Sequence, residues 1–149
     1  MNEESTTDLE HIVSQLKPND LHNYIDKYGS TNNNPKLYFD YINEWGIPCS
    51  DIVRHCEGLL SKSYVYDLIN AVKQNPSRDV VLILCICARM DRKATRRMLE
   101  NYGHRDLYSK DTRDIIIATY INNKNYNLDS INNELENYGL PTLKGSIKE

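Results

Sequence analysis

The amino-acid sequence predicts an all-α protein of about seven to nine helices. Apolar residues recur with a period near 3.6 through most of the 149-residue chain, and alternating, strand-like stretches are few. Residues that favour helix starts precede the apolar runs, and we expect them at Asn19, Ser77, Asp111 and Asp129. A five-residue segment also occurs twice, which indicates a repeated helical unit.

The first part of the chain is predicted to be an acidic helical extension, residues 1–34. One short helix should run from Thr7 to Leu16 and a second from Asn19 to Gly29. The polar stretch 30–35 reads as a loop and is the only candidate boundary, so residues 35–149 should form the main domain. There, Pro35 fits the first turn of a helix that ends at Gly46.

The middle of the chain predicts two short helices and one long apolar helix. The short helices, 50–57 and 61–72, are separated by a turn that contains Gly58. Ser77 then precedes the most apolar stretch, Val80–Met90. A helix with so little polar surface should form the centre of the core.

The second half repeats one helical hairpin. Leu99–Gly103 has the same sequence as Leu135–Gly139, and Arg78-Asp79 returns as Arg113-Asp114 before another apolar run. The offsets are 36 and 35 residues, which predicts two similar hairpins packed side by side. Each copy should end with the glycine in a left-handed conformation and the preceding tyrosine packed behind it.

Composition excludes several classes of protein. No apolar run is long enough to span a membrane, and the acidic, polar start does not resemble a secretory signal, so we expect a cytoplasmic protein. The four cysteines lack C-x-x-C spacing and should be reduced and buried. There is no metal-spaced His/Cys set, phosphate loop or nucleophile motif, so neither an enzyme nor a metal or cofactor site is expected.

Charge is divided along the chain, with net −5 in residues 1–47, +4 in 48–113 and −2 in 114–149. A basic middle suggests a surface that faces an anion. The basic residues are most concentrated in one cluster, where they recur every three or four residues, as on one face of a helix. The cluster could contact phosphates or an acidic protein and consists of Arg89, Arg92, Lys93, Arg96 and Arg97, with Arg105 nearby. A simple solvated helix face is about as good an interpretation.

The two short helices are predicted to form a helix-turn-helix core, to which the duplicated hairpin is attached. In the second helix Val65, Leu68 and Ile69 should face the core. Small polar residues at its start would let the helix enter a major groove, and Arg54 of the first helix would face the backbone. The predicted DNA-binding residues are Arg54, Ser61, Lys62, Ser63, Tyr64, Tyr66 and Asn70.

Three motifs in order resemble the Cro/phage-repressor (XRE) helix-turn-helix family, in a group from low-GC Gram-positive bacteria. They are the run Ser61–Tyr66, the segment Asn75–Asp79, and the stretch from Asn101 to Ile117, within a resemblance that covers about residues 37–143. The resemblance implies a five-helix DNA-binding core that reads double-stranded DNA through the helix at 61–70. Because one short helix rarely makes enough contacts, we expect a homodimer.

Departures from the family pattern and an acidic charge balance favour a different function on the same scaffold. The turn 56–60 is longer than is usual in that family, and Ala71-Val72 stand where a glycine normally closes the recognition helix, with one extra residue before Asn75. The chain also has an acidic pI and an acidic N-terminal segment, residues 1–47. Asp67 and Glu57 also add negative charge close to the expected phosphates. The alternative hypothesis is therefore a protein-interaction module, such as a signalling or phage-defence adaptor, that has lost DNA binding.

Overall fold

A computed structural model describes residues 14–15, 17–18, 34–72 and 75–145 of the chain. The expected helices at 7–16 and 19–29, with the start at Asn19, lie outside the described residues. Contacts divide the chain into two units, Met1–Asn33 and Asn34–Glu149, and the second contains every element discussed below.

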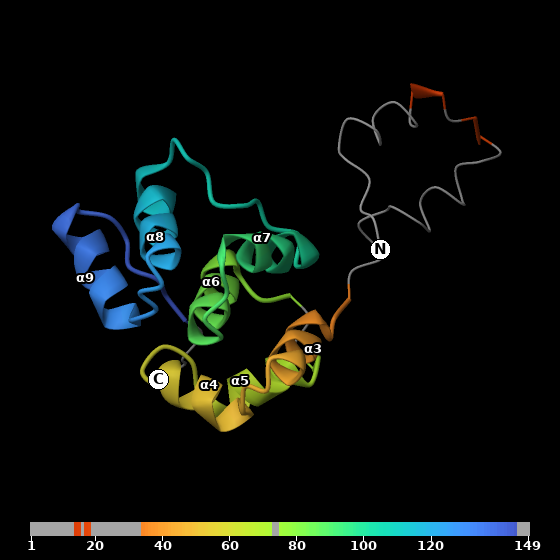
Figure 1. The fold of residues 1–149 in the computed structure, drawn as a ribbon, viewed down its shortest axis with the longest axis horizontal. Helices are drawn as coiled ribbons and strands as arrows, with labels where there is room; N and C mark the ends of the chain where they lie inside the picture. Colours follow the sequence, from red (N-terminus) through yellow and green to blue (C-terminus); the bar gives the residue numbers. More distant parts are fainter. Residues whose placement is uncertain (1–13, 16, 19–33, 73–74, 146–149) are drawn as a thin grey trace. The chain divides into compact units, whose positions relative to one another are not determined.

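The described part of residues 34–145 is all-α, as predicted, with seven helices and no strand (Figure 1). In the residues that the structure describes, no helix is both long enough and apolar enough to cross a bilayer. The helices are α3 (Leu37–Glu44), α4 (Cys49–His55), α5 (Lys62–Ile69), α6 (Arg78–Cys87), α7 (Arg92–Asn101), α8 (Thr112–Asn122) and α9 (Leu128–Asn137).

Helix α3 begins later than predicted. Pro35 lies in a turn before the helix, and Lys36 is the N-cap residue. Gly46 ends α3 with φ +66°, as expected for a left-handed glycine after a helix. The buried face of α3 carries Tyr38, whose hydroxyl donates a 2.9 Å hydrogen bond to the Leu84 carbonyl of α6.

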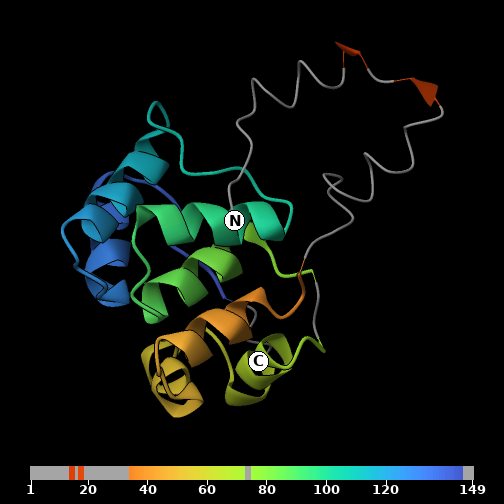
Figure 2. The ribbon, with the colours of Figure 1, turned by 45° about the vertical axis from the view of Figure 1, so that its right-hand side comes forward.

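Helix α6 is the centre of the core, as predicted. Every residue from Val80 to Cys87 is buried, because α4 packs on one side of the helix and α7 on another (Figures 1 and 2). The Ser77 side chain caps its start, as expected, by accepting a hydrogen bond from the Val80 N–H. The predicted end was wrong: α6 stops at Cys87, and Arg89 is left-handed with φ +54°.

The repeat forms two hairpins, α6–α7 and α8–α9, which are joined by contacts between α7 and α8. Gly103 and Gly139 are both left-handed, as predicted. Asp111 caps α8 as predicted, but the expected start at Asp129 was wrong, because Asn127 caps α9. The expected packing of the tyrosines holds only in the first copy, since Tyr138 is 63% exposed.

The repeated Arg-Asp pairs exchange partners between the hairpins. Arg78 binds Asp114 and Arg113 binds Asp79, each through two contacts of 2.9 Å. Arg78 also donates to the carbonyls of residues 105 and 106, and Arg113 to those of 141 and 142, which are the equivalent positions one repeat later. The two hairpins are therefore held together by the residues that the sequence duplicates.

The last described residues pack against the turn between α4 and α5. Leu143 is buried, and the Lys144 N–H donates to Asp79. A Cβ atom on Gly145 would overlap the carbonyl of Leu59, so only glycine fits there. The second hairpin thus supports the helix-turn-helix through its tail.

Candidate nucleic-acid interface

Helices α4 and α5 pack on each other, and α4 also packs on α6, with a turn between the two short helices. Ile52 of α4 and Val65 and Leu68 of α5 are buried, as the apolar spacing predicted. Ser61 lies just before α5, and its hydroxyl accepts a 3.2 Å hydrogen bond from the Tyr64 N–H. This cap fixes where α5 begins and leaves its first turn open to solvent.

Six residues, 56–61, connect the end of α4 with the start of α5. Gly58 has φ +89°, a backbone conformation that is strained for any residue with a side chain. Leu60 is buried in the core, with 2% of its surface exposed. Anchored by Leu60 and by the tail around Gly145, the long connection is a packed structural element. Its length is therefore compatible with a defined orientation of α5.

Three of the predicted DNA-binding residues line one shallow groove, of about 430 Å³, at this connection. Arg54 lies on its α4 side, and Ser61 and Lys62 lie at the start of α5. Glu57 lines the same groove and brings a negative charge into it. The structure thus joins residues that are seven or eight positions apart in the sequence.

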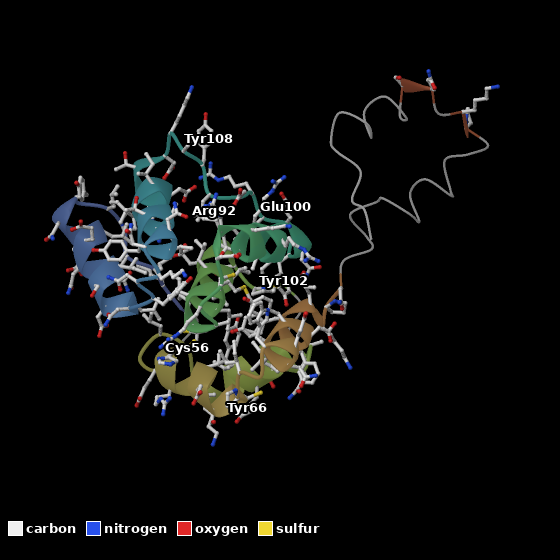
Figure 3. All side chains as sticks on the ribbon, in the orientation of Figure 1. Cys56, Tyr66, Arg92, Glu100, Tyr102 and Tyr108 are labelled. Atoms are coloured by element: carbon white, nitrogen blue, oxygen red, sulfur yellow. The ribbon has the colours of Figure 1, made fainter. Side chains whose placement is uncertain are left out.

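The other predicted contacts differ in accessibility. Ser63 and Asn70 are exposed, and Asn70 is the C-cap residue of α5. Tyr66 is half-buried and lies on the outer side of the α4–α5 pair (Figure 3). Tyr64 is also half-buried and packs against the hydrophobic core, which gives its ring a role in the fold.

The charge of this surface is close to neutral. Between Cys49 and Asn70 the chain carries three carboxylates and two cations. One of these cations, Arg54, forms an exposed 3.0 Å ion pair with Asp51. Arg54 and Lys62 are consequently the only cations that α4, α5 and their connection offer to a phosphate backbone.

The predicted basic cluster is divided between a turn and a helix. Arg89 lies in the turn before α7, while Arg92, Lys93, Arg96 and Arg97 lie on α7. Arg92 pairs with Asp106 at 3.1 Å, and Arg96 pairs with Glu100 at 3.0 Å near the far end of the helix, where Figure 3 labels Glu100. Arg105 also lies within 4 Å of two carboxylates.

Lys93 and Arg97 are the α7 cations that remain available. They are exposed, lie one turn apart, and form no ion pair with any residue that the structure describes. Asp106 and Glu100 thus bind part of the cluster, and its contact with phosphates or an acidic protein stays a prediction. Spacing along α7 reveals Glu100, which lies one turn after Arg96, but it does not reveal Asp106, which lies beyond the end of the helix.

Sequence reasoning missed a larger groove, of about 830 Å³, between the ends of α3, α6 and α8. Its lining includes Trp45, which follows α3 and is 66% exposed. Arg89 and Lys124 line it too, and they are 35 residues apart, the same offset as the Arg-Asp repeat. That shared offset was the available signal.

The cysteines are free, as expected, and three are buried; Cys49 is only half-buried. The Sγ atoms of Cys56 and Cys87 are 2.8 Å apart in the core, where their mutual hydrogen bond and burial raise the pKa of Cys87. Among the residues that the structure describes, no group of three or more His, Cys, Asp or Glu side chains is arranged to hold a metal ion.

Comparisons of the sequence with protein-family models, with curated proteins and with solved structures find no match. The resemblance to the XRE family therefore remains a prediction, carried by the motifs around Ser61, Asn75 and Asn101.

Proposed function

We propose that the α4–α5 pair is a DNA-reading helix-turn-helix and that the protein is a transcriptional regulator. The observation that carries this proposal is the open first turn of α5. Ser61, Lys62 and Ser63 are exposed there, and Arg54 of α4 lines the same groove as Ser61 and Lys62. Small side chains at the start of a packed helix let the backbone approach base edges closely.

In this proposal the two helices have different tasks. Asn70 of α5 presents donors and an acceptor to the major groove, where each base pair shows a distinct pattern. Lys62, in the first turn of α5, contacts a phosphate. Arg54 contacts the sugar-phosphate backbone and sets the register. The buried residues of α5 belong to the same hydrophobic core as those of α6–α9, and the tail at Gly145 packs against the connection that precedes α5.

The near-neutral surface sets the expected energetics. With Arg54 and Lys62 as the available cations, each protomer would neutralise about two phosphates. The logarithm of the association constant should therefore fall with the logarithm of the salt concentration, with a slope of about −2 for each protomer. Affinity for random DNA should be low, and useful affinity would require two protomers on two half-sites. We therefore propose that the protein binds DNA as a homodimer.

A salt-titrated binding assay tests the proposal. Duplexes selected from a random library are compared with mixed duplex DNA at several salt concentrations. Lys62→Ala should weaken both complexes and lower the slope by about one per protomer. Lys110→Ala, an exposed lysine on the α7–α8 connection, is the matched control and should change neither. Failure to select any sequence, together with no binding at low salt, would reject DNA recognition.

A protein-interaction module is the second candidate, and the charge distribution favours it. Arg78, Arg113, Arg92 and Arg96 are all engaged by carboxylates of the same chain, which leaves few cations for phosphates. The α4–α5 face would then bind another protein through Lys62, Tyr66 and Asn70. Retention of a protein from cell extract by the wild type and its loss in Tyr66→Ala, with no DNA binding by either, would favour this candidate.

A further inference from the structure

The groove beside Trp45 is built by segments that are distant in the sequence. Tyr41 and Trp45 come from α3 and its end, His55 from α4, Arg89 from the end of α6, and Lys124 from the end of α8. At about 830 Å³ it is within the size range of sites that bind small molecules. It is distinct from the groove at the start of α5, although Arg54 lines both.

Arg89 and Lys124 occupy equivalent positions in the two copies of the repeat. Each follows its helix in a left-handed conformation, with φ +54° and +57°. The same closing hydrogen bond follows each of them, from the Met90 N–H to the Cys85 carbonyl and from the Asn125 N–H to the Tyr120 carbonyl. This is the usual helix-ending motif, in which glycine is the unstrained residue.

Three other helices end with glycine in this conformation: Gly46 after α3, Gly103 after α7 and Gly139 after α9. Gly46 lines the groove too, but at the ends of α6 and α8, which also line it, strained cationic residues stand instead. The remaining non-glycine residue with positive φ among those described, Ala71 after α5, lies outside the groove. Backbone strain that the rest of the fold maintains is commonly found at functional positions. Both side chains are exposed and form no hydrogen bond or ion pair with the described residues.

Aromatic rings provide the other half of the groove. The rings of Tyr41 and Trp45 pack with their centroids 6.0 Å apart, and Trp45 still exposes 66% of its surface. Tyr126 of the α8–α9 connection lines the groove as well. An exposed indole beside unpaired cations suits a ligand that has a planar ring and an anionic group.

Carboxylates in the groove limit its positive charge without cancelling it. Asp51 is paired with Arg54. Asp91 caps α7 and lies close to Tyr41 and Tyr126. Burial and the neighbouring Asp91 carboxylate raise the pKa of both tyrosines. Arg89 and Lys124 outnumber the one unpaired carboxylate, Asp91, so the groove favours a compact anion of more than one charge.

We propose that this groove binds a nucleoside phosphate, with the base stacked on Trp45 and the phosphate held by Arg89 and Lys124. Stacking on an aromatic ring suits any nucleobase, and two cations together match a doubly charged phosphate. The base and phosphate could belong to a free nucleotide or to a single strand of nucleic acid. The proposal does not depend on duplex recognition by α5.

Trp45 is the chain's only tryptophan, so its fluorescence reports binding directly. The probes are AMP, ATP and a short oligodeoxyadenylate, with pyrophosphate and oligoglutamate as controls. We expect saturable quenching by at least one nucleotide probe and none by pyrophosphate or oligoglutamate. Quenching by ATP alone identifies a free nucleotide as the ligand, and stronger binding of the oligonucleotide identifies a single strand.

Glycine substitutions separate binding from folding. Arg89→Gly and Lys124→Gly remove a cation and relax a left-handed residue, so each variant should be at least as heat-stable as the wild type. Each should bind the quenching nucleotide about tenfold more weakly, because a charge-assisted contact is lost. Ala71→Gly is the matched control: it relaxes the left-handed residue after α5, φ +61°, outside the groove, and should leave binding unchanged.

Three results would overturn the proposal. One is the absence of quenching by every nucleotide probe at millimolar concentration. Another is wild-type affinity in both Arg89→Gly and Lys124→Gly. The last is tighter binding of oligoglutamate than of any nucleotide, which would assign the groove to an acidic protein segment.

Discussion

Arg78 and Asp114 lie 36 residues apart and are joined by two contacts of 2.9 Å, with the Asp114 side chain only 1% exposed. The same carboxylate accepts a hydrogen bond from the Tyr108 N–H. A buried carboxylate is tolerated when it is paired and its remaining lone pairs are bonded, which describes Asp114. Together with the reciprocal pair of Arg113 and Asp79, it connects the two hairpins.

Breaking the Arg78–Asp114 pair should destabilise the protein strongly. Arg78→Met leaves a buried carboxylate without its partner, and we expect the free energy of unfolding to fall by about 3–5 kcal/mol in urea denaturation. The matched control is Arg54→Ala, whose pair with Asp51 is exposed on both sides and should contribute at most about 1 kcal/mol. Similar losses in the two variants would contradict the structural role of the crossed pairs.

Stability should fall in acid. Burial raises the pKa of Asp79 and Asp114, but the arginine and backbone hydrogen bonds lower it by more, so both pKa values lie below the ordinary value of about 3.9. A carboxyl with a lowered folded pKa stabilises the fold at pH above its unfolded value, and this contribution disappears as the pH falls through the folded pKa.

Unfolding free energy should thus be nearly constant between about pH 5 and pH 7 and should decline below about pH 4. Urea denaturation across this range provides the measurement. Asp114→Asn should show a shallower decline, since one of the two responsible carboxyls is missing. An equal decline in this variant would mean that other groups cause the acid sensitivity.

The central helix gives a prediction about packing. Leu84 is 1% exposed within α6, so Leu84→Ala should lower the free energy of unfolding by about 2–5 kcal/mol. The exposed Ile115 of α8, 43% accessible, is the comparison, and Ile115→Ala should change stability much less. A loss below about 1 kcal/mol for Leu84→Ala would show that α6 is peripheral.

Gly145 should be needed for the packing of the tail on the turn. Gly145→Val places atoms where the Leu59 carbonyl lies, so the tail must shift and the protein should lose about 1–3 kcal/mol of stability. Lys144→Ala removes only an exposed side chain and should have little effect. Amide hydrogen exchange should be faster at Leu59 and Leu60 in Gly145→Val alone, and unchanged exchange there would disprove the contact.

The last prediction concerns the outer side of α5, which carries Tyr66 and Asn70, and it rests on the proposed DNA binding. Asn70 is exposed and Tyr66 is half-buried on the outer side of α5. Asn70→Ala or Tyr66→Ala should weaken binding to a selected duplex by about 1–3 kcal/mol and alter binding to random DNA much less, because base contacts discriminate between sequences. Ser109→Ala, on the distant α7–α8 connection, should leave both affinities unchanged.

Equal weakening on both kinds of DNA would assign Tyr66 and Asn70 to backbone contacts. No change on the selected duplex would remove the recognition-helix assignment, and binding to a protein partner would then be measured with the same variants.

Local patterns were enough to predict the helical class, the buried α6 helix and the two hairpins. Apolar periodicity and caps such as Ser77 and Asp111 act between residues in one or two helical turns, so they can be read directly. The sequence placed the start of α9 at Asp129, although Asn127, two residues earlier, is an equally suitable cap. In the structure Asn127 is the cap, and the first residue of the helix, Leu128, is buried in the core.

The tertiary structure decided which charges are available and which residues meet. Arg92 is paired with Asp106, which lies beyond the end of α7 and reaches Arg92 only through the path of the α7–α8 connection. The Arg96–Glu100 pair, by contrast, lies within one turn of α7 and can be read from the sequence. Arg89 and Lys124 belong to different hairpins, and only the packing of the repeat brings both to the groove of Trp45. Side-chain partners depend on distances in space, and a linear pattern contains those distances only within a helix or a turn.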